Sequence, residues 1–196
     1  MELLDAGRSV LVVIDLQGKL MEVVHRPAMV VETTKRLMKL AEMFGIPVIL
    51  TEQYPKGLGP THAEVLAGFE SLTVAKRMLA KTAFGCCGDS AFLGALDELR
   101  PRTRSGPRQV VVAGVEAHVC VMQTVLELIH WGNQVHVSWD AVSGRGEEYR
   151  RHALERMAAA GAAITNHESV GFEWARDKNH PRFKELSSLF KEPQPA

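Results

Sequence analysis

Three residues with reactive side chains follow apolar runs that have the pattern of buried strands. Asp15 ends the first such run, Lys81 lies just beyond a weaker strand at 71–78, and Cys120 follows the run at 109–115. In open parallel sheets, ligands bind outside the carboxyl ends of the strands, where the strand order reverses. If the first and fourth strands are central neighbours, Asp15 and Cys120 share one crevice, and Lys81 reaches it from the third strand.

These side chains have the chemistry of an acyl-transfer site. A thiol with a pKa of about 8.5 is mostly protonated at neutral pH, but a helix N-terminus and a nearby ammonium group both favour the thiolate. Asp15 is placed to take a proton from the thiol, or from water when a covalent intermediate breaks down. Backbone N–H groups between Gly114 and Cys120 are candidate donors to an oxyanion. Together they predict transfer through a thioester.

Each of these residues also has a structural interpretation. Free cysteine is among the most buried residue types, so Cys120 fits equally well as a core residue. An aspartate that closes a strand often caps a helix or loop, and a lysine after a strand is usually a solvated surface charge. Their common position at one edge of the predicted sheet is what favours chemistry.

The chain alternates between strand and helix patterns. Strands are expected at 9–15, 46–51, 71–78, 109–115, 134–142 and 162–165, and helices at 27–44, 88–100, 119–132 and 147–161. Such alternation predicts a mostly parallel sheet with helices on both faces. We therefore expect one α/β domain over residues 1–196, with its core at about 9–170.

The helix patterns give more detailed expectations. Gly45 supplies a stop signal, and Asp89 is a candidate helix cap. After Cys120, the spacing places Val119, Met122, Leu126 and Ile129 on one helical face. The apolar segment 182–190 either packs on a neighbouring subunit or covers its own sheet, and Lys191 to Ala196 are expected to form a frayed tail.

Composition excludes several classes of protein. Lys plus Arg and Asp plus Glu each total 23, without a basic block, so neither nucleic acid nor an anionic membrane is expected as a partner. No apolar run approaches the roughly 18 residues that span a bilayer. The turn after the first strand lacks a G-x-G-x-x-G phosphate loop. Three cysteines are too few for a disulfide framework, so we expect a reducing compartment, with the cytoplasm favoured over an organelle.

Three blocks of the chain together resemble the isochorismatase-like cysteine hydrolases. They read VLVVIDLQGKL, AKTAFGCCGDSAFLGAL and QVVVAGVEAHVCVMQTVLELIHWGNQVHVSWDAVSG, and they cover about 9–146 in the order of that family. The resemblance implies a doubly wound sheet of order 3-2-1-4-5-6 and a catalytic triad of Asp15, Lys81 and Cys120. It also implies a cis peptide bond between Val115 and Glu116, with the N–H groups of Glu116 and Cys120 forming an oxyanion hole.

The chain departs from the nicotinamidases of that family after the second strand. Their Asp-x-His metal motif is replaced by Gln53 and Pro55, and the loop resembles that of the isochorismatase domain-containing proteins. None of the eight histidines forms an HxH or HxxxH pair, so we expect no metal and no cofactor. His118 lies two residues from Cys120, and residues at that spacing do not face each other on a helix.

The family likeness also suggests a substrate pocket, for which Gln17, Gln53, Tyr54 and Phe84 are candidates. Their structural alternative is that they are loop polar groups and core aromatics. Isochorismatases act on a vinyl ether without a cysteine nucleophile, so the retention of Cys120 favours hydrolysis of an amide or a related carbon–nitrogen bond. No role is assigned to Cys87.

Three hypotheses follow. The leading one is a metal-independent cysteine hydrolase of small amides that acts through a Cys120 thioester and assembles as a homo-oligomer. A second is a partner-binding protein that keeps the fold but catalyses weakly. A third is a thiol redox protein that uses Cys120 or the Cys86–Cys87 pair, because reactive thiolates also oxidise readily.

Overall fold

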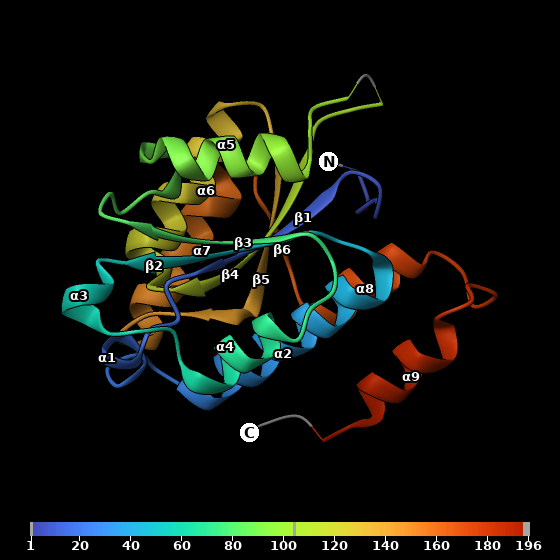
Figure 1. The fold of residues 1–196 in the computed structure, drawn as a ribbon, viewed down its shortest axis with the longest axis horizontal. Helices are drawn as coiled ribbons and strands as arrows, with labels where there is room; N and C mark the ends of the chain where they lie inside the picture. The colour runs from blue at the N-terminus through green and yellow to red at the C-terminus, as the bar shows by residue number, and fades with distance from the viewer. Residues whose placement is uncertain (1, 104, 194–196) are drawn as a thin grey trace.

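A six-stranded parallel sheet forms the centre of the protein in the computed structural model, which describes residues 2–103 and 105–193 (Figure 1). The strand order is β3-β2-β1-β4-β5-β6, so the expected doubly wound topology is confirmed. The strands are β1 (Ser9–Ile14), β2 (Val48–Gln53), β3 (Lys76–Lys81), β4 (Gln109–Val115), β5 (Gln134–Ser143) and β6 (Ala163–Thr165).

Helices cover both faces of the sheet. One layer contains α2 (Pro27–Phe44), α4 (Ala63–Glu70), α8 (His167–Ala175) and α9 (Phe183–Lys191), and the other contains α5 (Ser90–Leu99), α6 (Met122–His130) and α7 (Glu147–Ala159). Successive side chains of a strand point to opposite faces. In β1, Leu11 and Val13 therefore join the α2 core, whereas Val12 and Ile14 join the α5 and α6 core. Burial on both faces explains why this strand is continuously apolar.

Two helix boundaries follow from local chemistry that the sequence shows. Pro27 lies in the first turn of α2, and the helix ends at Gly45, whose φ of 69° is a left-handed conformation that favours glycine. Asp89 caps α5, since its carboxylate accepts a hydrogen bond from the backbone N–H of Ala91 at 2.8 Å. Both expectations are confirmed.

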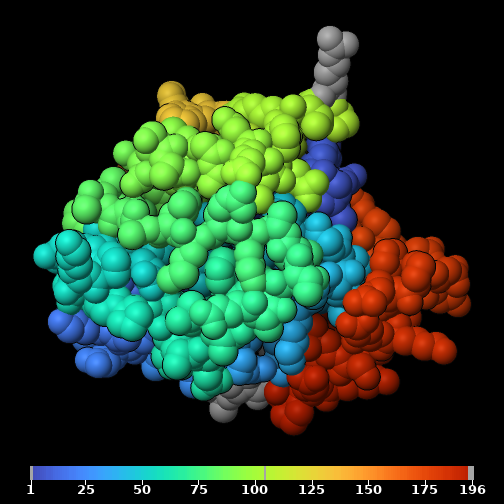
Figure 2. Space-filling view, in the orientation of Figure 1, coloured from blue at the N-terminus to red at the C-terminus, as the bar shows by residue number. Residues whose placement is uncertain are grey.

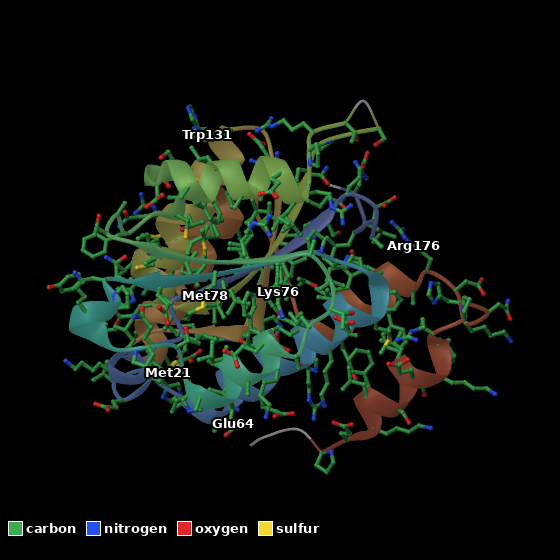
Figure 3. All side chains as sticks on the ribbon, in the orientation of Figure 1. Met21, Glu64, Lys76, Met78, Trp131 and Arg176 are labelled. Atoms are coloured by element: carbon green, nitrogen blue, oxygen red, sulfur yellow. The ribbon has the colours of Figure 1, made fainter. Side chains whose placement is uncertain are left out.

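The third strand begins later than the sequence pattern indicates. It spans 76–81 instead of 71–78, because the apolar residues Leu72 and Val74 pack into the α2 core as part of the connection from α4. Lys76 folds back from the start of β3, and its ammonium donates to the carbonyl oxygens of Phe69 and Leu72 (Figure 3). Because β3 extends to 81, Lys81 is its last residue and does not lie beyond the strand.

The helix after β4 begins with a π turn (Ala117–Val121) that precedes α6. Val121, Val125 and Leu128 are among its fully buried apolar residues. The helical face formed by Val119, Met122, Leu126 and Ile129 is half-buried. Three of these side chains, Val119, Met122 and Ile129, pack at the edge of the same core.

The C-terminal helix packs against its own chain. Leu186 and Leu189 of α9 are buried in the α2 core, and Gly171 of α8 leaves room for Leu186 and Phe190. Figure 2 shows this segment in red at one side of the molecule. The start of the expected frayed tail is anchored, because Arg36 donates to the carbonyl oxygen of Pro193 at 2.6 Å. The rest of that tail, 194–196, lies outside the described residues. Within 2–103 and 105–193, no helix has the length and apolarity needed to cross a membrane.

Candidate active site

Asp15 and Lys81 meet at the carboxyl edge of the sheet. Asp15 follows β1, Lys81 ends β3, and β2 lies between these two strands. The Lys81 Nζ lies 2.7 Å from the Asp15 Oδ2, and both side chains are buried. The flexible lysine side chain therefore crosses β2, since adjacent strands are about 4.8 Å apart.

The buried ammonium group of Lys81 is fully surrounded by acceptors. Besides the Asp15 Oδ2, the Gln53 Oε1 at 2.8 Å and the carbonyl oxygens of Ala83 and Phe84 at 3.2 and 3.0 Å lie within hydrogen-bond distance, so four acceptors share its three N–H donors. A buried charge is costly unless it is paired and hydrogen-bonded, and here it is both. The groups around Lys81 therefore compensate for the burial of its charge.

Asp15 is held by its neighbours on the central strands. Its backbone has a φ of 53°, a left-handed conformation that is uncommon for residues with a side chain. Its Oδ1 accepts a hydrogen bond from the Thr51 hydroxyl at 2.7 Å, and its N–H donates to the Thr51 carbonyl oxygen at 3.1 Å. Lys81 and Thr51 thus each bind one carboxylate oxygen.

Cys120 lies in the π turn after β4, beside this pair, with 5 % of its surface exposed. Burial raises the pKa of its thiol to about 12, the nearby Asp15 carboxylate adds to the increase, and Lys81 opposes it. Burial and Asp15 thus act against the thiolate that the helix N-terminus and Lys81 favour, so a nucleophilic role for Cys120 requires a base that takes its proton.

Cys86 and Cys87 differ in their surroundings, and all three cysteines are free thiols. Cys86 lies in a short 3-10 turn (Cys86–Gly88), with its sulfur 4.0 Å from the Thr51 hydroxyl. Its N–H donates to the Thr124 hydroxyl at 2.9 Å, and that hydroxyl donates to the Cys120 carbonyl oxygen at 2.7 Å. Burial raises the pKa of Cys86 to about 11, and burial together with Glu127 raises that of Cys87 to about 12.

The peptide bond between Val115 and Glu116 is cis, as the resemblance implies. The buried Glu116 carboxylate accepts from the Arg145 Nε at 2.7 Å and from its Nη2 at 3.3 Å. Arg145 is a partner that the sequence analysis missed, since only the fold brings the end of β5 to this turn. His118 stacks on Tyr149, with 4.8 Å between ring centroids, and its Nδ1 is buried without a partner among the described residues.

The four candidate pocket residues divide into two kinds. Gln17 and Gln53 are buried: the Gln17 amide binds the backbone of Gln53 and the carbonyl oxygen of Gly59, and the Gln53 Nε2 binds the carbonyl oxygen of Thr82. Tyr54 and Phe84 are 54 % and 55 % exposed and follow β2 and β3 at the same edge. The two glutamine side chains are therefore held by hydrogen bonds to the backbone, whereas the two aromatic rings are exposed at this edge.

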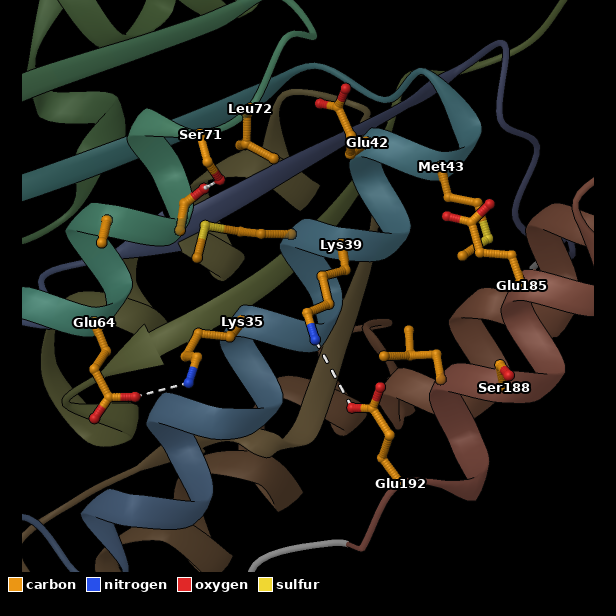
Figure 4. Close-up of a pocket in the computed structure, with 14 residues that line it drawn as sticks. Lys35, Lys39, Glu42, Met43, Glu64, Ser71, Leu72, Glu185, Ser188 and Glu192 are labelled. Atoms are coloured by element: carbon orange, nitrogen blue, oxygen red, sulfur yellow. Dashed lines mark hydrogen bonds and ion pairs between the residues drawn. The ribbon is translucent and has the colours of Figure 1, made fainter.

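A cavity of about 620 Å³ lies away from this edge, between α2, α4 and α9 (Figure 4). Two ion pairs lie along its lining: Lys35 pairs with Glu64 at 2.7 Å, and Lys39 pairs with Glu192 at 3.8 Å. Among the residues that the structure describes, no group of three or more His, Cys, Asp or Glu side chains has the arrangement of a metal site.

Comparison with known proteins identifies the family. The chain matches the Isochorismatase domain over residues 9–169. It belongs to the isochorismatase family. This isochorismatase-like chain is 41 % identical over 189 residues to the human isochorismatase domain-containing protein 2, a match that covers 96 % of this chain and 86 % of that protein.

Solved structures of isochorismatase-like proteins agree with this assignment. The MAR1 ribonuclease from Caenorhabditis elegans is 34 % identical, with a TM-score of 0.87 over 100 % of this chain and 95 % of that one. YcaC from Pseudomonas aeruginosa, solved with hexane-2,5-diol and covalent acrylamide, is 26 % identical, with a TM-score of 0.81 over 97 % and 98 % of the two chains. YcaC from Escherichia coli, described as an octameric hydrolase of unknown specificity, is 26 % identical, with a TM-score of 0.79 over 97 % of each chain.

Proposed function

We propose that this isochorismatase-like protein is a metal-independent cysteine hydrolase that cleaves the carbon–nitrogen bond of a small amide. The observation that carries the proposal is the buried ion pair of Asp15 and Lys81, at 2.7 Å, beside the Cys120 thiol. A protonated thiol with a carboxylate next to it is a nucleophile paired with its base. A purely structural cysteine has no need of this charged pair.

In the first half of the reaction, Asp15 takes the proton of the Cys120 thiol as its sulfur attacks the amide carbon. N–H groups of Glu116 and Cys120 are the proposed donors to the oxyanion. The tetrahedral intermediate collapses, Asp15 returns the proton to the leaving nitrogen, and the amine departs. Lys81 remains charged and balances the carboxylate when that is ionised.

The second half hydrolyses the thioester. Asp15 removes a proton from a water molecule, whose oxygen attacks the acyl carbon. The carbon–sulfur bond then breaks, and the sulfur regains its proton from Asp15. The carboxylic acid leaves, and the enzyme returns to its starting protonation state.

Covalent acrylamide in YcaC supports a nucleophile in this fold, because acrylamide is an electrophile that thiolates attack. The direct test is turnover of a panel of primary amides by the wild-type protein and by Cys120→Ser. We expect Cys120→Ser to lose at least a thousandfold in kcat/KM, since removal of a nucleophile abolishes the covalent route. Equal turnover by both proteins would overturn the proposal.

The name of the MAR1 neighbour suggests ribonuclease activity as a second candidate. The balanced charge of this chain, with 23 basic and 23 acidic side chains, does not favour binding to a phosphate backbone, so we expect no RNA cleavage. Incubation with single-stranded RNA, with Cys120→Ser as the control, separates the two activities. RNA cleavage by the wild-type protein but not by the variant would move the site from amide to phosphodiester chemistry.

We also propose that the protein is a homo-oligomer with a small-molecule substrate, in a reducing compartment such as the cytoplasm. The octameric E. coli YcaC and the exposed Tyr54 and Phe84 at the site edge support assembly. The three free thiols support the compartment. Light scattering after size-exclusion chromatography measures the assembly, and a monomer at all concentrations would contradict it.

A further inference from the structure

The strand between Asp15 and Lys81 carries two polar residues on the face that the lysine side chain crosses. Thr51 and Gln53 are two residues apart on β2, so their side chains project from the same face of the sheet. The register places Thr51 beside Ile14 of β1 and Gln53 beside Lys81 of β3. Thr51 therefore lies next to the end of β1, which Asp15 follows, and Gln53 lies next to Lys81.

Thr51 binds the carboxylate. Its hydroxyl is buried and donates to the Asp15 Oδ1 at 2.7 Å, while Lys81 binds the other carboxylate oxygen. Thr51 and Lys81 thus each hold one oxygen of the Asp15 carboxylate, which fixes the direction of this side chain.

Gln53 binds the ammonium. Its Oε1 accepts from the Lys81 Nζ at 2.8 Å, and its Nε2 donates to the carbonyl oxygen of Thr82 at 2.7 Å, which fixes the orientation of the amide. Gln17 holds the Gln53 backbone from the other side. The amide is neutral, so Asp15 is the one carboxylate among the described partners of Lys81.

We propose that Thr51 and Gln53 are positioning residues that hold the Asp15 carboxylate and the Lys81 ammonium in the geometry that the reaction needs. The proposal rests on the proposed function, because the pair matters only if Asp15 is the base for Cys120. The Gln53 amide contacts the Lys81 ammonium directly, so its proposed role is to hold that group.

The readout is the single-turnover acylation of Cys120 by p-nitrophenyl acetate, measured as p-nitrophenol release and by peptide mass spectrometry between pH 3 and 9, a range that includes the ordinary aspartate pKa of about 3.9. This probe does not require the natural substrate. The rate falls at acid pH, where the base is protonated. A purely structural role would change the rate or the melting temperature but leave the midpoint of this acid limb in place.

Thr51→Val removes the hydroxyl with little change in shape. We expect the acid limb to move up by about one pH unit, since a hydrogen bond to a charged group stabilises it by about that amount. Thr51→Ser keeps the donor and should restore the wild-type profile. If Thr51→Val folds poorly, the serine variant and the Gln53 variants below still test the proposal.

Gln53→Glu replaces the neutral acceptor by a carboxylate of the same shape. The new charge repels Asp15 and competes for Lys81, so we expect the acid limb to move up by about one pH unit or more. Gln53→Met removes the acceptor without adding charge and should lower the acylation rate about tenfold through loss of lysine placement. The matched control is Glu52→Gln on the opposite face of β2, where Glu52 binds Thr61, and its midpoint should equal the wild-type value.

Lys81→Met distinguishes a failure of the proposed hydrolase function from a failure of the positioning roles of Thr51 and Gln53. If wild-type Cys120 is not acylated, the proposed function fails, and the positioning roles fail with it. If Lys81→Met shifts the acid limb while Thr51→Val and Gln53→Glu retain the wild-type midpoint, only the positioning roles are overturned. Shifts in all three variants, with Glu52→Gln unchanged, support both.

Discussion

The thiols at positions 86, 87 and 120 all have pKa values above the ordinary value of about 9, because they are buried. The stability that they contribute is fully present below the unfolded pKa of about 9. It is lost as the pH rises toward the folded values of about 11 to 12, since the unfolded chain then releases protons that the folded chain retains. The free energy of unfolding should therefore decrease between pH 9 and 11, by at most about 1.4 kcal/mol per pH unit for each thiol.

Cys87 provides the cleanest test, because it lies apart from the Asp15 pair and is close to Glu127. We expect Cys87→Ala to show a shallower alkaline loss than the wild-type protein in urea titrations at pH 8, 9, 10 and 11. The other groups that titrate there are common to both proteins and cancel in the difference. A difference in unfolding free energy that stays constant over this range would contradict the buried-thiol account.

At the scale of elements, Gly114 shows how closely β4 approaches β1. A Cβ atom there would lie 2.2 Å from the carbonyl oxygen of Ile14, at a φ of 136°. We expect Gly114→Ala to prevent folding or to lower the unfolding free energy by more than about 3 kcal/mol. Gly94 in α5 is the control, because a Cβ there meets nothing within 4 Å, and Gly94→Ala should stabilise by about 0.5–1 kcal/mol. Equal melting temperatures for the two variants would contradict this packing.

The central strands and two helix ends can be predicted from the sequence, whereas the edge strand β3 cannot. The central strands carry their own signal because they are buried on both faces, and Gly45 and Asp89 mark helix ends by local chemistry. The edge strand β3 is largely exposed, so its pattern is weak, and the apolar residues of the preceding connection obscure its start. Predicting β3 correctly would have required knowing that Leu72 packs on α2.

The residues of the candidate site also differ in whether the sequence alone predicts their roles. The positions of Asp15, Lys81 and Cys120 after three strands are readable from sequence, and the topology explains why Asp15 and Lys81 meet. The roles of Thr51 and Arg145 depend on register and on a distant turn, which spacing along the chain does not encode. The pKa of the Cys120 thiol depends on its burial and on Asp15 as well as on Lys81, and spacing along the chain does not encode these surroundings.

At the scale of the whole molecule, the C-terminal helix completes the core on the α2 face. Leu186 is fully buried there, so Leu186→Ala should lower the unfolding free energy by about 2–4 kcal/mol. Val23 is 53 % exposed and serves as the control, with an expected loss below about 1 kcal/mol for Val23→Ala. If Leu186→Ala unfolds at the same urea concentration as Val23→Ala, then α9 does not pack on this core in solution.

The central claim is that Cys120 is the nucleophile and that Asp15 is its base. It is tested most directly by identifying, through peptide mass spectrometry, the residue that p-nitrophenyl acetate acylates in the native protein. We predict an acetyl group on Cys120 in the wild-type protein, a rate at least a hundredfold lower in Asp15→Asn, and no label on Cys86 or Cys87 before unfolding. An acetyl group on another residue, or equal rates for the wild-type and Asp15→Asn proteins, would contradict the account.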